Sequence, residues 1–152
     1  MNEKLPVILL VDDNEDDLLI MNMAFKRAEF NGRVSLVKGG DEAIAYLKGD
    51  GVFSDRRAFP LPTVILLDLN MPKTNGFEVL EWVRQQPALR RISIIILTAS
   101  TRAEDVERAF DSGANSFLVK PGNIAVLTAM LRCMSEWLQY NHFPPLNETV
   151  KR

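Results

Sequence analysis

Five polar side chains that could do chemistry together each come at the end of a short apolar run. The runs VILLV, TVILLDL, SIIILT and SFLV lead into Asp12-Asp13, Asp68, Thr98 and Lys120. Carboxylates that share a site disfavour one another's ionised form, so a cluster of them needs a countercharge. Mg²⁺ is a hard cation that takes oxygen ligands and meets this need. The residue types therefore predict a site for a divalent cation.

The elements that must position these residues are short strands. The apolar runs predict five strands, at 7–11, 34–37, 63–69, 93–98 and 116–119. Three of the runs are continuous stretches of β-branched residues and leucine rather than alternating ones. Continuous runs are typical of strands buried on both faces, as in a parallel sheet covered by helices.

Helix-like segments alternate with the strands. We predict helices at about 15–29, 41–48, 75–86, 102–112 and 124–140. Asn14 can cap the first helix, and Thr101 with Glu104 predicts a capping box for the fourth. Gly32 and Gly113 suit the ends of the first and fourth helices. Five β-α units predict an α/β fold, a doubly wound five-stranded parallel sheet with right-handed crossovers.

This fold would bring the polar strand ends together. The carboxyl ends of parallel strands meet at one edge of the sheet, and ligands bind beyond that edge. Asp12, Asp13, Asp68, Thr98 and Lys120 all fall there, whereas the second strand, which ends in Lys38-Gly39-Gly40, adds only a loop.

Each acidic residue also has an interpretation without a ligand. Glu15, Asp16 and Asp17 fit the first turn of a solvated helix, where negative charge is favourable. Both interpretations stay open for Asp12 and Asp13. Asp68 lies within TVILLDLNMP, where an unpaired carboxylate would be costly.

Composition excludes several classes of protein. The 152 residues are 47% hydrophobic and 25% charged, with a net charge of −2, which fits one globular domain and gives no basic surface for nucleic acid. No apolar run is long enough to span a membrane or to act as a signal peptide. Cys133 is the only cysteine and cannot form an internal disulfide. We therefore expect a cytoplasmic protein.

The motifs VDDN, LLDLNMPKTNG, LTAS and FLVKP, in this order, resemble the receiver domains of two-component response regulators over about residues 5–140. The resemblance implies a flavodoxin-like (βα)5 fold with Asp68 as phosphoacceptor. It also implies that Asp12, Asp13, Asp68 and the backbone carbonyl of Asn70 bind Mg²⁺. By the same resemblance, the protein accepts a phosphoryl group from a histidine kinase and catalyses only its own phosphorylation and dephosphorylation.

The resemblance gives roles to three further residues. Thr98 would be the switch hydroxyl and Lys120 the ammonium that binds phosphate, with a cis peptide bond between Lys120 and Pro121. Phe117 would be the switch aromatic that turns inward, although an ordinary core aromatic also fits its position. Asn70 and Ser100 flank the approach to the phosphoryl group and are expected to tune its lifetime.

The fifth helix and the tail indicate how the protein would pass its signal to a partner. We divide the chain into a receiver domain at 1–140 and a tail at 141–152, so we expect a stand-alone receiver that acts through protein contacts. The fifth helix carries two apolar stripes: Ile124, Leu127, Leu131, Met134 and Leu138 form the first, and Val126, Met130, Cys133, Trp137 and Tyr140 the second. The second stripe predicts a homodimer with the tail as an arm across the partner, although a wide core face would also explain it.

The loop at 49–62 and the tail are similar to those of response regulators associated with phytochromes, which implies a phytochrome-type histidine kinase as partner. Three other functions compete. A phosphohydrolase of the haloacid dehalogenase type needs an acid where this chain has Asn70, and a dinucleotide binder needs a glycine-rich turn after the first strand. A degenerate receiver used only as a dimerisation scaffold would not need the complete set of five polar residues.

Overall fold

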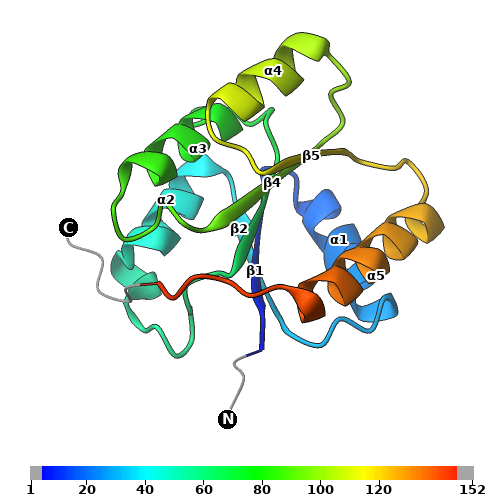
Figure 1. Ribbon diagram of the computed structural model, residues 1–152, viewed down its shortest axis with the longest axis horizontal. Helices are drawn as coiled ribbons and strands as arrows, with labels where there is room; N and C mark the ends of the chain where they lie inside the picture. Colours follow the sequence, from blue (N-terminus) through cyan, green and yellow to red (C-terminus); the bar gives the residue numbers. More distant parts are fainter. Residues whose placement is uncertain (1–4, 147–152) are drawn as a thin grey trace.

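The computed structural model describes residues 5–146, and its centre is a five-stranded sheet (Figure 1). All strand pairs are parallel, in the order β2-β1-β3-β4-β5. The strands are β1 (Val7–Asp12), β2 (Arg33–Lys38), β3 (Val64–Leu67), β4 (Ser93–Thr98) and β5 (Ser116–Val119). The predicted fold class is confirmed.

Five helices cover the two faces of the sheet. They are α1 (Glu15–Arg27), α2 (Gly40–Lys48), α3 (Gly76–Gln85), α4 (Ala103–Asp111) and α5 (Ile124–Tyr140). Helices α1 and α5 lie on one face, and α2, α3 and α4 lie on the other (Figure 1). The predicted helices are all present, with bounds that differ by at most two residues. Within residues 5–146, no helix has both the length and the apolar character that a bilayer crossing needs.

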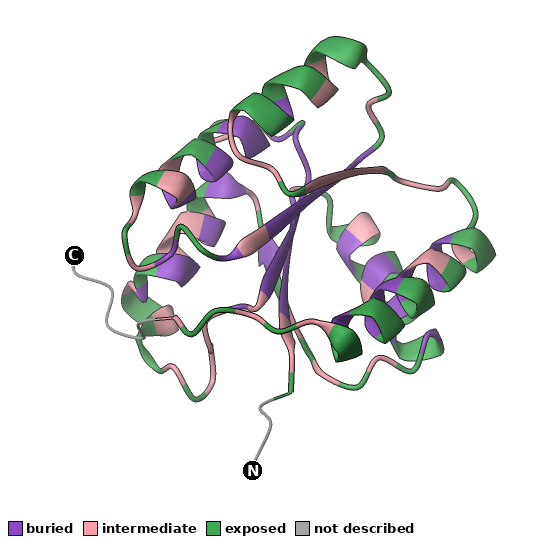
Figure 2. Cartoon of the chain, in the orientation of Figure 1, coloured by how far each residue is buried: buried purple, intermediate pink, exposed green. Residues whose placement is uncertain are grey.

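Strand β1 shows why these strands are continuously apolar. Ile8 and Leu10 pack into the core beneath α1 and α5, whereas Leu9 and Val11 pack into the core beneath α2, α3 and α4. Successive side chains of a strand point to opposite faces. Because both faces are covered, every position is apolar, and the strands form the buried centre of the molecule (Figure 2).

Two helix ends follow the sequence prediction and two do not. The Asn14 side chain accepts a hydrogen bond from the backbone N–H of Asp17 at 3.1 Å, and Gly113 adopts a left-handed φ of 108° after α4. The predicted capping box of Thr101 with Glu104 is wrong, because α4 begins after Arg102 and that residue makes no side-chain cap. Gly32 does not end α1, which stops at Arg27.

The loop between α2 and β3 is fastened to the body. It contains a short 3-10 helix, η1 (Gly51–Ser54), and its Phe53 and Phe59 rings pack against Tyr46 at centroid distances of 5.2 and 5.9 Å. The Arg56 guanidinium donates hydrogen bonds to the carbonyls of Tyr46 and Leu47 at 2.7 and 2.8 Å. The loop precedes β3, so it lies at the amino edge of the sheet, opposite the polar strand ends.

The tail after α5 crosses the same amino edge (Figure 1). Phe143 packs against the core beneath α1 and α5, and Leu146 packs against the core on the other face. The described part of the tail thus contacts its own chain on both sides of the sheet. Residues 147–152 of the predicted arm lie outside the described residues.

Candidate functional site

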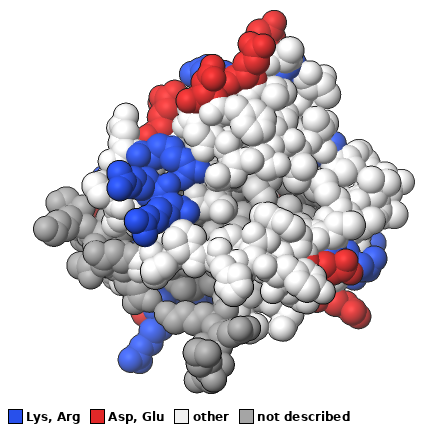
Figure 3. All heavy atoms as spheres, in the orientation of Figure 1, with Lys and Arg blue, Asp and Glu red and all other residues white. Residues whose placement is uncertain are grey.

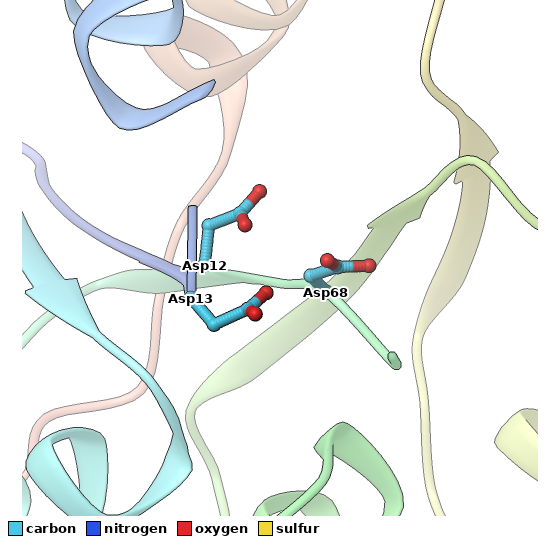
Figure 4. Close-up of side chains that lie close together, drawn as sticks. All are labelled: Asp12, Asp13 and Asp68. Atoms are coloured by element: carbon cyan, nitrogen blue, oxygen red, sulfur yellow. The ribbon is translucent and has the colours of Figure 1, made fainter. Parts of the chain in front are cut away.

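Three carboxylates meet at the carboxyl edge of the sheet. Asp12 ends β1, Asp13 follows it, and Asp68 comes directly after β3. Each offers a carboxylate oxygen, and these oxygens all lie within 4.8 Å of one another (Figure 4). Strands β1 and β3 are hydrogen-bonded neighbours in the sheet, so residues 56 positions apart in the chain come together here. The sequence prediction that these acids share one site is confirmed.

Lys120 places its ammonium among these acids. Its Nζ atom donates a hydrogen bond to a carboxylate oxygen of Asp12 and lies 3.8 Å from a carboxylate oxygen of Asp68. Burial alone would lower the pKa of Lys120, but the hydrogen bond to Asp12 and the charges of Asp68, Asp12 and Asp17 outweigh it and raise the pKa. The side chain is therefore a fixed positive charge in the site.

Asp68 is the carboxylate most affected by its surroundings. It is 8% exposed, and this burial raises its pKa above the usual value of 3.8. Lys120 and the hydroxyl of Thr98 act in the opposite direction, while the charge of Asp12 adds to the rise. Thr98 ends β4 and is fully buried. The site is thus short of positive charge around a carboxylate held away from water.

The turn after β3 fixes the direction of Asp68. The backbone N–H of Asp68 donates to the carbonyl of Val11 at 3.1 Å, which continues the sheet ladder by one residue. The backbone N–H of Gly76 then donates to the carbonyl of Leu69 at 3.0 Å. A Cβ atom at Gly76 would lie only 2.2 Å from the Asp68 carbonyl oxygen, so glycine is required for α3 to start this close.

The donor set fits a hard divalent cation. Three carboxylates supply oxygen ligands only, and Asp12 and Asp68 are buried while Asp13 is half-exposed. A cation bound there would add the positive charge that the buried acids lack. The residues that would hold it are Asp12, Asp13 and Asp68, and the role of the Asn70 carbonyl stays a prediction.

Other predicted site residues have mixed outcomes. Phe117 is half-buried and packs against the core on the α2, α3 and α4 face. The described chain contains no cis peptide bond, so the predicted cis bond between Lys120 and Pro121 is wrong.

Asp17 is a site neighbour that the sequence prediction missed. Its carboxylate lies 3.6 Å from the Lys120 ammonium, although we assigned it to a solvated first turn of α1. Asn14 caps α1 through the Asp17 backbone and itself donates an N–H to Asp12 at 3.0 Å. Because the turn between Asp12 and α1 is short, the first turn of α1 lies next to the site.

Comparison with known proteins identifies the family. The family model described as "Response regulator receiver domain" matches residues 8–132. The chain belongs to the response regulator receiver family. The acids, the hydroxyl and the lysine of the site all lie within the matched residues.

Two curated relatives are similar to this receiver over most of their length. The probable methanogenesis regulatory protein FilR2 of Methanothrix harundinacea is 35% identical over 91% of this chain and 87% of its own length. The response regulator Rcp1 of Synechocystis is 34% identical over 88% of this chain and 89% of its own length.

Solved structures of similar receivers share the fold. The response regulator RPA3017 "in red light signaling of R. palustris" has a TM-score of 0.86 at 34% identity and covers 93% of this chain and 99% of its own. The phosphorylated cyanobacterial phytochrome response regulator RcpA has a TM-score of 0.83 at 32% identity, with the same two coverages. The Mn²⁺-bound form of Rcp1 has a TM-score of 0.79 at 33% identity and covers 92% of this chain and 99% of its own. The receiver therefore closely resembles response regulators associated with phytochromes.

The raised pKa of Asp68 predicts an unusual dependence of stability on pH. The folded chain holds the Asp68 proton more tightly than the unfolded chain does, so this group's contribution falls as pH rises from about 3.8 through the raised pKa. Without a divalent cation, Asp68→Asn should therefore melt at a higher temperature than the wild type at neutral pH. The matched control is Asp16→Asn, which removes an exposed acid from the first turn of α1, where negative charge is favourable, and should therefore melt slightly below the wild type rather than above it.

Addition of Mg²⁺ should reverse this order, so that the wild type melts at a higher temperature than Asp68→Asn. A ligand at 100 times its dissociation constant stabilises the folded state by about 2.7 kcal/mol, roughly 5–10 °C for a chain of this size. The wild type should gain this shift, and Asp68→Asn should gain much less. Thermal melts at several pH values, with and without Mg²⁺, measure both effects, and equal Mg²⁺ shifts would contradict the predicted site.

Proposed function

We propose that this receiver accepts a phosphoryl group from a histidine kinase onto Asp68. The observation that carries the proposal is the buried Asp68 carboxylate, held next to two further acids and the ammonium of Lys120. Phosphorylation by acetyl phosphate in the presence of Mg²⁺, followed by intact mass, tests it. A degenerate receiver that serves only as a scaffold would gain no mass.

The chemistry assigns a task to each side chain. A carboxylate oxygen of Asp68 attacks phosphorus, an O–P bond forms, and the bond from phosphorus to the imidazole nitrogen of the donor histidine breaks. The imidazole leaves with the bonding electrons and takes up a proton. Lys120 offsets the negative charge shared by the carboxylate and the phosphoryl oxygens, and the Thr98 hydroxyl is placed to donate to one of those oxygens. Mg²⁺, when bound, supplies further positive charge.

The described site does not contain the general acid that hydrolysis of a separate phosphate ester would need. The residue two positions after Asp68 is Asn70, an amide that cannot act as the general acid of a phosphohydrolase. We therefore propose that the protein catalyses only the gain and loss of its own phosphoryl group. Turnover of a simple phosphate ester would contradict this.

The relatives support a proposal for the partner kinase. Among the similar structures, RcpA is a phytochrome response regulator and RPA3017 acts in red light signalling. We propose a phytochrome-type kinase for this chain as well, supported by the match over nearly the whole length of both proteins. Phosphotransfer from a purified phytochrome kinase, compared with an unrelated histidine kinase, tests the pairing.

A homodimer through α5 is the assembly that the exposed surface favours. The first stripe of α5 is largely buried, whereas Val126, Trp137 and Tyr140 of the second stripe are exposed by 55, 49 and 84%. Met130 of the second stripe packs against the core beneath α1 and α5, whereas these three exposed side chains do not belong to the core. The face shown in Figure 3 carries few charged side chains over α5 and β5. An exposed apolar patch of this kind suits a partner, here a second copy.

Trp137→Glu should break this dimer. A tryptophan at the centre of an interface contributes about 2 kcal/mol or more, so the dimer dissociation constant should rise roughly 30-fold. Analytical ultracentrifugation over a concentration series measures it. Gln139→Glu adds the same charge to an exposed position outside both stripes and should leave the dimer unchanged. A wild type that is monomeric at every concentration would contradict the dimer.

A further inference from the structure

Helix α4 is weakly held at the end that lies near the site. Ala109 is its only buried residue, and Arg102 at its start makes no side-chain cap. Its other end is fastened, because the Arg84 side chain of α3 donates to the carbonyl of Gly113 at 2.9 Å and to the Asn115 side chain at 2.8 Å. A displacement of α4 is therefore easier at its first turn than at its last.

Ser100 takes the place of the missing cap. Its hydroxyl donates to a carboxylate oxygen of Asp105 at 2.5 Å and accepts the backbone N–H of Arg102 at 3.3 Å. Asp105 is the third residue of α4, so through Ser100 it satisfies the backbone N–H of the N-cap residue, which is one of the two hydrogen bonds of a capping box. We call this pair of hydrogen bonds the Ser100 latch.

The Ser100 latch is directly connected to the phosphorylation site. The backbone N–H of Ser100 donates to the hydroxyl oxygen of Thr98 at 3.4 Å, which is a long hydrogen bond. Thr98 is fully buried beside Asp68. If the Thr98 side chain rotates so that its hydroxyl donates to a phosphoryl oxygen on Asp68, its oxygen atom moves away from the Ser100 N–H, and this long hydrogen bond breaks. The backbone of Ser100 can then move, and the first turn of α4 is held to that backbone by the Ser100 latch.

The first turn of α4 also borders the space in front of the site. A hollow of about 490 Å³ lies between the segment from Leu69 to Phe77 and α4, and Asp105 and Arg108 form the α4 side of it. The Arg108 guanidinium lies over the Phe77 ring at 4.0 Å from its centroid. A shift of the first turn would change the shape of this hollow next to Asn70.

We propose that Asp105 is a positioning residue that couples the Thr98 hydroxyl to α4 through Ser100. The Ser100 latch holds the loop and the first turn in the arrangement of the unphosphorylated site, and occupation of the site by a phosphoryl group works against it. The inference rests on the proposed function, because it takes phosphorylation at Asp68 as the event that moves Thr98.

The test uses beryllofluoride with Mg²⁺ as the phosphoryl mimic and calorimetry on the full chain. Coupling between two sites is reciprocal, so loss of the latch must change the affinity for the mimic. Asp105→Ala removes a restraint on Thr98 and should tighten beryllofluoride binding about fivefold or more. Ser100→Ala removes the same bond from the other side, so the double variant should bind like either single variant.

Two controls separate the latch from a general effect on α4. Asp105→Asn keeps an acceptor for the Ser100 hydroxyl and should bind like the wild type. Glu107→Ala removes an exposed acid from the same helix and should also leave the affinity unchanged. A residue that merely stabilised α4 would change the melting temperature but not the affinity for the mimic.

Hydrogen exchange provides a second readout. In the wild type, beryllofluoride should change the exchange of the backbone amides in the first turn of α4. In Asp105→Ala, the mimic should still bind, but this change should fall several-fold. Wild-type affinity and a wild-type exchange response in Asp105→Ala would overturn the inference alone. A wild type that does not bind beryllofluoride would contradict the proposed function itself, and the inference with it.

Discussion

Asp68→Asn should abolish the gain of a phosphoryl group from acetyl phosphate and Mg²⁺. Asparagine has nearly the shape of aspartate, but its amide is not a nucleophile toward phosphorus. The wild type should gain the mass of one phosphoryl group, and hydroxylamine, which cleaves acyl phosphates, should remove it. Intact mass spectrometry measures both steps. We expect a complete loss of phosphorylation because the described site offers no other carboxylate that is both buried and placed at the end of β3.

The matched control for this variant is Asp16→Asn, an exposed acid in the first turn of α1. It should be phosphorylated like the wild type. If Asp68→Asn still gains one phosphoryl group, the phosphoacceptor is a different residue, and peptide mapping would locate it. If the wild type gains none, the scaffold interpretation is correct.

Lys120→Met should reduce the rate of phosphorylation by about 10²–10³-fold, the usual effect of removing one charged or polar group that stabilises a transition state. The ammonium lies 3.8 Å from the Asp68 carboxylate and is the nearest positive charge that the structure records for it. It also lowers the pKa of Asp68, so its loss raises that pKa further. Because only the ionised carboxylate attacks, the acidic limb of the rate profile should move to higher pH.

Lys38→Met is the control for this variant. Lys38 also ends a strand at the carboxyl edge, but it is exposed and pairs with Glu15 at 3.2 Å. Exposed pairs of this kind contribute little, so the rate should stay close to that of the wild type. Equal rates for the two lysine variants would show that the ammonium of Lys120 has no part in the transfer.

Most of the fold could be predicted because the apolar runs are short, continuous and evenly interrupted. The run before Asp12 already indicates a strand covered on both faces, and burial of Ile8, Leu9 and Leu10 confirms it. Once the strands are parallel, their carboxyl ends share an edge, so the grouping of Asp12, Asp13 and Asp68 follows from topology. This is why the acids of the site could be named from the sequence.

The remaining errors concern local contacts that compete with equally good alternatives. The residues Ser100, Thr101, Glu104 and Asp105 offer two overlapping caps, and the sequence does not decide between them. The structure forms the Ser100 latch, which leaves Thr101 exposed. Asp17 was missed for a similar reason, because helix spacing alone does not show which side of the first turn faces Lys120.

The order of the strands has a consequence for protein synthesis. Residues 12, 68, 98 and 120 complete the site, so a nascent chain still on the ribosome lacks the ammonium until β5 has emerged. The acids of β1 and β3 can pair earlier, but they then lack their nearest positive charge. If the protein accepts a phosphoryl group on Asp68 as proposed, a nascent chain that has not yet folded as far as Lys120 would be a poor acceptor.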